Sequence, residues 1–191
     1  MTFWNAYILV ILLIYLVAFF LRNLKTYFSV KTSIRGKSRK LTITLILSAI
    51  IYQLIFIQLF YPAFIHFLIE LDFMQIDFIN YTGYLLNFIA LTIGLAALFE
   101  MRNSWRIGIK HDQKTALVTT GIYAISRNPY FLSYDLLFLS IWFIFPSLIF
   151  LLLILVLAIA FHLMILEEED YLKKAQGAVY QEYKNQVRRY F

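Results

Sequence analysis

Cysteine is absent from the sequence, and histidine occurs only as His66, His111 and His162. The lack of cysteine excludes disulfide scaffolds, thiol nucleophiles, iron–sulfur clusters and cysteine zinc sites. Three histidines scattered along the chain leave little for a histidine metal site. We therefore expect no metal.

Charged residues are also scarce: they make up 15% of the 191 residues, whereas 62% are hydrophobic. A soluble domain has roughly a quarter of its residues charged and about half apolar, so the composition excludes a water-soluble globule. A formal net charge of +6 would indicate nucleic acid as the partner of a soluble protein. In so apolar a chain the Lys and Arg residues first set the orientation in a membrane, and we expect the lipid bilayer, not nucleic acid, as the partner.

Lys and Arg are missing from two long stretches, residues 41–101 and 128–172. Each stretch must leave the side of the membrane on which the basic residues lie and return to it, so each contains two spans. The 17 basic residues fall into three blocks, at 22–40, 102–127 and 173–189. The positive-inside bias places all three blocks in the cytoplasm.

The apolar runs predict an all-α integral membrane protein with five transmembrane helices and a C-terminal amphipathic cytoplasmic helix. Crossing the hydrocarbon core takes roughly 20 apolar residues. The predicted spans are residues 3–21, 41–60, 81–99, 130–145 and 147–166. The chain is then a single membrane domain (1–191) whose N-terminal part (1–100) holds three helices. We expect a multi-pass protein of the cell membrane with its N-terminus outside and its C-terminus in the cytoplasm.

Two features mark the predicted external side. The loop between the second and third spans carries Glu70, Asp72 and Asp77 without a cation, and Pro62 marks the end of the second helix. Pro146 lies in the middle of the apolar run 130–166, where a tight turn would produce a helical hairpin.

Polar residues gather in two predicted cytoplasmic segments, residues 105–134 and 162–191. Polar groups that crowd the membrane surface without being needed for solubility indicate function. In the first segment Pro129 marks the start of a helix, because its missing N–H would be unpaired there anyway. Arg127 beside it is either a functional group or a simple snorkelling anchor.

The second segment contains four consecutive acids at residues 167–170. Acids are unfavourable near the negative end of a helix dipole and near anionic lipid, so we expect a compensating partner, either Arg127 or a cationic ligand. The alternative is a solvated acidic collar. Beyond the acids, apolar and aromatic residues recur at helical spacing and predict an amphipathic helix along the interface. These residues are Leu172, Val179, Tyr180, Tyr183 and Val187.

The motifs in these two segments follow a recognisable order. The first segment holds Leu117-Val118, Gly121-Ile122-Tyr123 and Arg127-Asn128-Pro129, and after one predicted hairpin come Glu167-Glu168, Gly177-Ala178-Val179-Tyr180 and Tyr183. In this order the sequence resembles the isoprenylcysteine carboxyl methyltransferases and their prokaryotic relatives, a wider group that includes phospholipid methyltransferases. The resemblance covers the C-terminal part of the chain, and the first two helices match only in hydropathy.

This resemblance implies an S-adenosylmethionine-dependent methyltransferase, with residues 101–191 as the cofactor-binding core. It also implies a lipophilic acceptor that enters from the bilayer, with an isoprenoid or lipid carboxyl, hydroxyl or amine group. Carried over by position, the cofactor-binding residues are Thr115, Ala116, Leu117, Val118, Tyr123, Asn128, Pro129, Tyr130, Phe131 and Glu168. The chemistry agrees, because Glu168 complements a cationic amine and sulfonium, and Tyr123 or Tyr180 offers a wall for adenine. We expect the neighbouring Glu169 and Asp170 to be solvated.

Two departures from the family pattern bear on the acceptor. Asn128 stands where His is common, which keeps a hydrogen-bonding side chain but removes a titrating one. Met164 stands four residues before Glu168, where the carboxyl methyltransferases carry an Arg that recognises the substrate carboxylate. Residues four apart share a helix face, so Met164 would point into the same cavity without a charge.

Asp135 lies inside the predicted fourth span, where an acid is costly without a role or a partner. It follows Asn128 by seven residues, close to two helical turns, so we expect both on one helix face. Asp135 is either a base for an uncharged or weakly acidic headgroup, or a group that hydrogen-bonds a neighbouring Tyr or Ser. We place Arg127, Glu167 and Asp135 in catalysis, and Met164 and Tyr134 against the acceptor. Methyl transfer from a sulfonium is an in-line displacement, so it requires neither a metal nor a covalent intermediate.

Two other interpretations remain open. The membrane sterol reductases have a similar helix start and hairpin, but they use NADPH, whose 2′-phosphate demands clustered cations, whereas four acids follow the last span here. The other interpretation is a non-catalytic membrane protein in which the polar segments are only structural.

Overall fold

The computed structural model describes residues 2–30, 36, 38–62, 70–71, 74–106, 108 and 116–190. Over these residues the chain forms six α-helices: α1 (Phe3–Val30), α2 (Arg39–Phe60), α3 (Asp77–Met101), α4 (Pro129–Ile144), α5 (Leu148–Gln176) and α6 (Ala178–Gln186). Two short 3-10 helices, η3 (Arg102–Ser104) and η4 (Gly121–Ala124), lie between α3 and α4.

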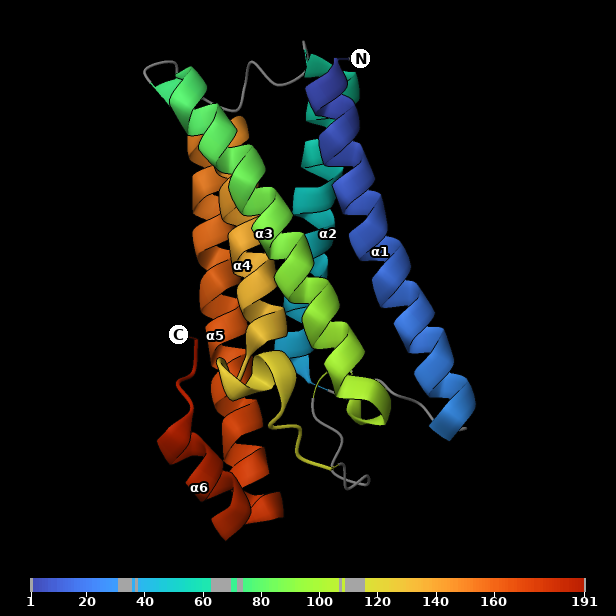
Figure 1. Cartoon of the computed structure of the whole chain (residues 1–191). Coiled ribbons are helices and arrows are strands. Elements are labelled where there is room, and N and C mark those ends of the chain that lie inside the picture. Colours follow the sequence, from blue (N-terminus) through green and yellow to red (C-terminus); the bar gives the residue numbers. More distant parts are fainter. Residues whose placement is uncertain are drawn as a thin grey trace.

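Helices α1 to α5 run along the long axis of the molecule, and α6 lies beside the end of α5, at the end of the bundle opposite the N-terminus (Figure 1). The most extensive packing joins α3 to α4. Between these two helices Asn87 Nδ2 donates a buried hydrogen bond of 2.9 Å to Ser140 Oγ. Buried apolar side chains from all five long helices form the core, among them Tyr15, Ile51 and Phe138. The bundle is therefore held by apolar packing with few internal polar links.

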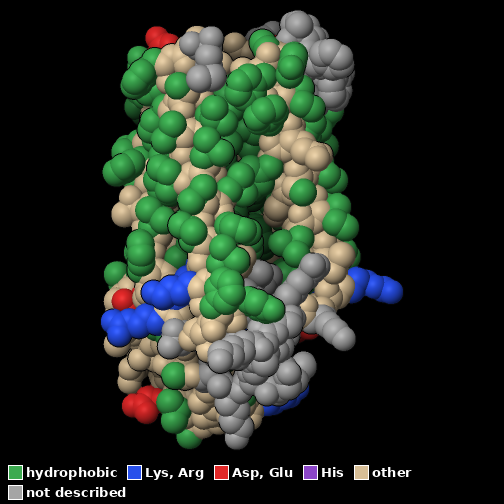
Figure 2. All heavy atoms as spheres, turned by 90° about the vertical axis from the view of Figure 1, so that its right-hand side faces the viewer, with side chains coloured by type: hydrophobic (Ala, Val, Ile, Leu, Met, Phe, Trp, Pro, Cys, Tyr) green, Lys and Arg blue, Asp and Glu red, His purple; other side chains and the backbone are tan. Residues whose placement is uncertain are grey.

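Four helices, α1, α2, α3 and α5, are long and apolar enough to cross a membrane. Helix α4 is apolar as well but has only 16 residues. The five spans predicted from the sequence thus correspond to four helices of full length and one shorter helix. Large apolar side chains cover the outside of the bundle, and most charged side chains visible in Figure 2 lie toward one end. Such a surface is suited to lipid.

The predicted hairpin at Pro146 is present between α4 and α5. Ser147 Oγ caps α5 by accepting a hydrogen bond from Phe150 N at 3.1 Å. Trp142 Nε1 donates to the Ser147 carbonyl at 3.1 Å, and Leu71 N donates to the Pro146 carbonyl at 3.0 Å. The segment after α2 is thereby tied to the turn, although Asp72 lies outside the described residues.

Helices α1 and α5 continue past their predicted ends, α1 from Leu21 to Val30 and α5 from Leu166 to Gln176. The apolar run marks only the part of a helix that lies in lipid, and Lys, Arg, Glu and Gln are good helix formers that allow it to continue. Helix α5 ends at Gly177, whose φ of +57° is a conformation that favours glycine. The helix predicted from Leu172 onward is therefore divided between α5 and α6.

The absence of cysteine permits a test of the membrane orientation by single-cysteine labelling. Ile76, before α3, and Val179, on α6, are exposed at opposite ends of the bundle. We expect a membrane-impermeant maleimide to label Ile76→Cys in intact cells, and Val179→Cys only after permeabilisation, because the described residues of the basic blocks, such as Lys40, Arg127 and Lys184, lie at the α6 end (Figure 1). Labelling of Val179→Cys in intact cells would contradict the predicted orientation.

Candidate functional site

A cavity of about 350 Å³ lies toward the α6 end of the bundle, between α1, α2, α4, α5 and the segments that join α3 to α4. Its apolar wall includes Leu16 and Phe19 of α1 and Leu45 and Ala49 of α2. On the side of the molecule where α1 lies, the surface is hollowed between apolar side chains (Figure 2). The cavity therefore combines an apolar wall with a polar wall.

The polar wall begins with the turn that holds Tyr123. Gly121 has a φ of +58°, and a Cβ added there would lie 2.8 Å from the Glu100 carboxyl carbon, so the position requires glycine. The Glu100 carboxylate accepts a hydrogen bond of 2.5 Å from Thr120 Oγ1. This turn places Tyr123 in the cavity wall, where its carbonyl accepts a hydrogen bond of 2.6 Å from Tyr183 Oη of α6.

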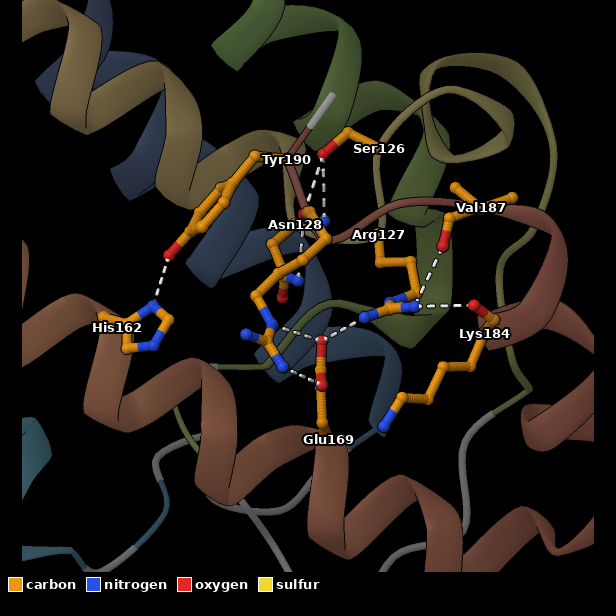
Figure 3. A network of polar contacts seen from close by, with 9 residues as sticks. Ser126, Arg127, Asn128, His162, Glu169, Lys184, Val187 and Tyr190 are labelled. Atoms are coloured by element: carbon orange, nitrogen blue, oxygen red, sulfur yellow. Dashed lines mark hydrogen bonds and ion pairs between the residues drawn. The ribbon is translucent and has the colours of Figure 1, made fainter.

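The centre of the polar wall is the buried carboxylate of Glu169, which two arginines share (Figure 3). Arg127 Nη2 lies 2.8 Å from Glu169 Oε1. Arg189 donates from Nη2 to Oε2 at 2.9 Å and from Nε to Oε1 at 3.0 Å. The side chains of Arg127 and Glu169 are only 7% and 8% exposed. The expected partnership of Arg127 with the acids is present, but the expectation that Glu169 is solvated is wrong.

Arg127 also donates hydrogen bonds to backbone carbonyls of residues 184–188. Its Nη1 donates to the carbonyls of Lys184 and Val187, both at 2.9 Å, and its backbone N–H donates to the Arg188 carbonyl at 3.0 Å. Residues 187–190, which we call the tail segment, thus lie beside residues 126–128, which we call the mouth segment.

Side chains of the mouth segment add further bonds to the tail segment. Ser126 Oγ and Asn128 Nδ2 both donate to the Arg189 carbonyl, at 3.2 and 3.3 Å. Tyr190 Oη lies 2.8 Å from His162 Nδ1 of α5 (Figure 3). Because an amide donor of Asn128 is used in this way, the orientation of its side chain depends on the tail segment.

Glu168 precedes Glu169 on α5 and lines the same cavity. Among the residues that the structure describes, its carboxylate has no hydrogen-bond or ion-pair partner. Burial raises the pKa of Tyr123 well above its usual range, and the nearby charge of Glu168 raises it further. Tyr123 is therefore a neutral aromatic wall beside a carboxylate that has no described partner, an arrangement that suits a cationic ligand with a ring system.

Most of the residues predicted from the sequence line this cavity. They are Ala116, Leu117, Val118, Tyr123, Arg127, Asn128, Tyr130, Phe131, Tyr134, Met164 and Glu168. Thr115 lies outside the described residues. Pro129 is the buried first residue of α4 and does not itself line the cavity. Glu167 is also outside the lining and pairs with Lys40 at 3.0 Å near the surface.

Asp135 does not line the cavity, although Asn128, seven residues earlier, does. The spacing implies a shared face only if both residues are helical. Asn128 precedes α4 with φ −132° and ψ 50°, so the spacing does not hold. The charge of Asp135 instead acts on Tyr190 of the tail segment, whose pKa is raised by burial and further by this carboxylate.

Sequence reasoning missed the contribution of α2 and of the tail segment. Helix α2 places Thr44, Ser48 and Tyr52 on the cavity wall. Their spacing of four residues in a mostly apolar helix is a polar stripe that was visible in the sequence. Arg189 and Tyr190 follow no comparable pattern, because their partners are distant in the sequence.

A comparison with family models matches residues 78–178, more than half of the chain, to the phospholipid methyltransferases. The chain belongs to this family. The match confirms the resemblance of the sequence to membrane methyltransferases. It runs from α3 to the first residue of α6 and includes Arg127, Glu168 and Glu169, whereas the tail segment lies beyond it. Comparisons with curated proteins and with solved structures give no significant match.

The shared carboxylate predicts which of the four acids supports folding. We expect Glu169→Gln to lower the free energy of unfolding by about 3 to 5 kcal/mol, because it leaves two arginines, one of them buried, without their charged partner. Glu168→Gln and Asp170→Asn are the matched controls and should change stability little, since Glu168 has no described partner and Asp170 is exposed. Thermal unfolding in detergent micelles measures the difference. Equal stability of all three variants would contradict the shared ion pair.

Proposed function

We propose that this membrane methyltransferase uses S-adenosylmethionine to methylate a lipid, the amine headgroup of a phospholipid. The observation that supports this most directly is the composition of the cavity wall. The carboxylate of Glu168, which has no partner among the described residues, and the aromatic rings of Tyr123 and Tyr180 line the same cavity as apolar residues of α1 and α2. One cavity thus offers a place for a cationic cofactor and a place for a lipid.

The residues present fit S-adenosylmethionine. Glu168 would hold its cationic groups, and the segment 116–118 with Tyr123 would enclose the rest of the molecule. When bound, S-adenosylmethionine supplies an electrophilic methyl group on a positively charged sulfur. Arg127 does not compete for Glu168, because Glu169 already engages its guanidinium at 2.8 Å. Because Glu169 pairs with Arg127, the carboxylate of Glu168 stays available to a ligand in the cavity.

The acceptor reaches the cavity from the bilayer in this proposal. Leu16, Phe19, Leu45 and Ala49 form the wall of α1 and α2 that would contact acyl chains. Helices α4 and α5 act as a membrane hairpin, which gives five spans, and α6 lies at the cytoplasmic interface. The headgroup of a lipid would then enter beside Glu168 while its chains stay in the apolar part.

The chain itself aligns the two reactants and excludes water from them, as an in-line displacement needs. Tyr130 Oη and Tyr134 Oη lie 3.3 Å apart in the cavity wall. The headgroup ammonium must first lose a proton to solvent. The hydroxyl oxygens of the two tyrosines would then accept hydrogen bonds from the N–H groups of the neutral amine and so orient its lone pair. Neither Asp135 nor Glu167 lines the cavity, so we assign neither a role in this step.

The wall near Glu168 favours an acceptor without a carboxylate. Met164 lines the cavity one helical turn before Glu168, and its sulfur accepts a hydrogen bond of 3.1 Å from Thr44 Oγ1. Neither side chain carries a charge that would neutralise the carboxylate of an isoprenylcysteine. NADPH is likewise disfavoured, because Arg127 in the cavity wall is already paired with Glu169, and the carboxylate of Glu168 would repel a ligand with three phosphates.

Binding measurements on the purified protein test the cofactor. We expect S-adenosylmethionine to bind the wild type and NADPH not to bind. Glu168→Gln should weaken the affinity for S-adenosylmethionine by about 10- to 150-fold, the equivalent of one charge-assisted hydrogen bond of roughly 1.5 to 3 kcal/mol. Asp170→Asn, an exposed acid on the same helix, is the control and should bind as the wild type does.

Titration calorimetry in detergent micelles separates the alternatives. NADPH binding without S-adenosylmethionine binding would favour a reductase, and binding of neither would favour a structural protein. An affinity for S-adenosylmethionine that Glu168→Gln leaves unchanged would show that this carboxylate is not the cofactor anchor.

A further inference from the structure

Arg22 lies at the end of the apolar part of α1. Some of the N–H donors of its guanidinium have no described acceptor. Its Nε and Nη2 atoms are buried and have no hydrogen-bond partner among the described residues. A guanidinium offers five N–H donors, and buried donors are paired in nearly all proteins. A snorkelling anchor would expose these nitrogens to water and headgroups. Arg22 is half-buried as a whole, but the burial of these two nitrogens calls for a ligand.

Arg22 is not itself a lining residue, but it lies next to the cavity wall on α1. Phe19, one helical turn earlier, lines the cavity, and residues three apart share a helix face. Asn23, the next residue, accepts a hydrogen bond of 2.7 Å from Nε1 of Trp105, another lining residue. The charge of Arg22 acts on Tyr123, whose pKa it lowers against the burial that raises it. This end of α1 is therefore fastened to the cavity wall.

Two other cations at the α6 end of the bundle, Arg127 and Lys40, already have carboxylate partners. Arg127 is held by Glu169 and by two backbone carbonyls, and Lys40 pairs with Glu167. Arg22 is different, because two of its nitrogens have no described acceptor. Arg106, the residue after Trp105, also lines the cavity and carries a positive charge. An anion that enters between α1 and Trp105 would meet these charges.

We propose that Arg22 binds the phosphate group of the phospholipid acceptor. This rests on the proposed function and adds the group that selects the acceptor. A planar guanidinium pairs with two phosphate oxygens at once, which a lysine does not reproduce. The apolar residues Leu16 and Phe19 precede Arg22 on α1 and would contact the acyl chains, so the order of groups along the helix follows the order of groups in the lipid. Arg22 is then a specificity determinant and not a reacting group.

A pair of matched acceptors tests this role. One is phosphatidylethanolamine, and the other is a synthetic lipid with the same acyl chains and the same amine, in which a neutral carbonate replaces the phosphate. Initial rates of methyl transfer in mixed micelles give KM for each acceptor, and calorimetry gives the affinity for S-adenosylmethionine. The variants are Arg22→Gln, Arg22→Lys and the control Lys25→Gln, which removes an exposed cation from the same end of α1.

We expect Arg22→Gln to raise KM for phosphatidylethanolamine by at least about tenfold, the equivalent of one charge-assisted contact. KM for the phosphate-free lipid and the affinity for S-adenosylmethionine should not change. Arg22→Lys should lie between Arg22→Gln and the wild type, and Lys25→Gln should match the wild type. Arg22→Lys keeps the test decisive if Arg22→Gln does not fold.

Several results would overturn the proposal. An unchanged ratio of the two KM values in both Arg22 variants would show that Arg22 does not read the phosphate, and an equal loss on both acceptors would assign it a structural role. Wild-type protein that binds S-adenosylmethionine but prefers the phosphate-free lipid would also reject it. The proposed function fails separately, when the wild type methylates neither lipid.

Discussion

The buried carboxylate of Glu169 is the interaction on which the polar end of this protein depends. It joins α5, the mouth segment and the tail segment, because Arg127 and Arg189 come from two different parts of the chain. A buried carboxylate without such partners is strongly unfavourable. With both arginines in place, the carboxylate instead holds the mouth segment, which precedes α4, and the tail segment together. The cavity wall is built from these segments, so its shape depends on this ion pair.

The same interaction explains why two adjacent acids have different roles. Consecutive helical residues point about 100° apart, so holding Glu169 toward Arg127 fixes the direction of Glu168 as well. Glu168 is left facing the cavity without a described partner. The tail segment takes part through Arg189 and through its carbonyl bond to Asn128, although it lies beyond residues 78–178 that match the phospholipid methyltransferases. Contacts with the tail segment therefore help to stabilise the region that matches the family.

The sequence predicted the helices well because apolar runs and basic blocks are local signals. It predicted helix ends less well, since polar residues continue α1 to Val30 and α5 to Gln176. Motif order indicated most of the lining residues, including Tyr123 and Glu168. It did not indicate that Glu169 is buried, because its partner Arg189 is distant along the chain. Asp135 was placed by helical spacing counted from a residue that is not helical.

The central claim, methyl transfer to a lipid, is tested most directly with labelled cofactor. Purified protein in phosphatidylethanolamine vesicles is incubated with S-adenosylmethionine that carries a radioactive methyl group, and the lipids are extracted and separated by headgroup. We expect label in N-methylated phospholipid, with little in extracts from the Glu168→Gln variant. Folded wild-type protein that binds S-adenosylmethionine but leaves every lipid fraction unlabelled would contradict it.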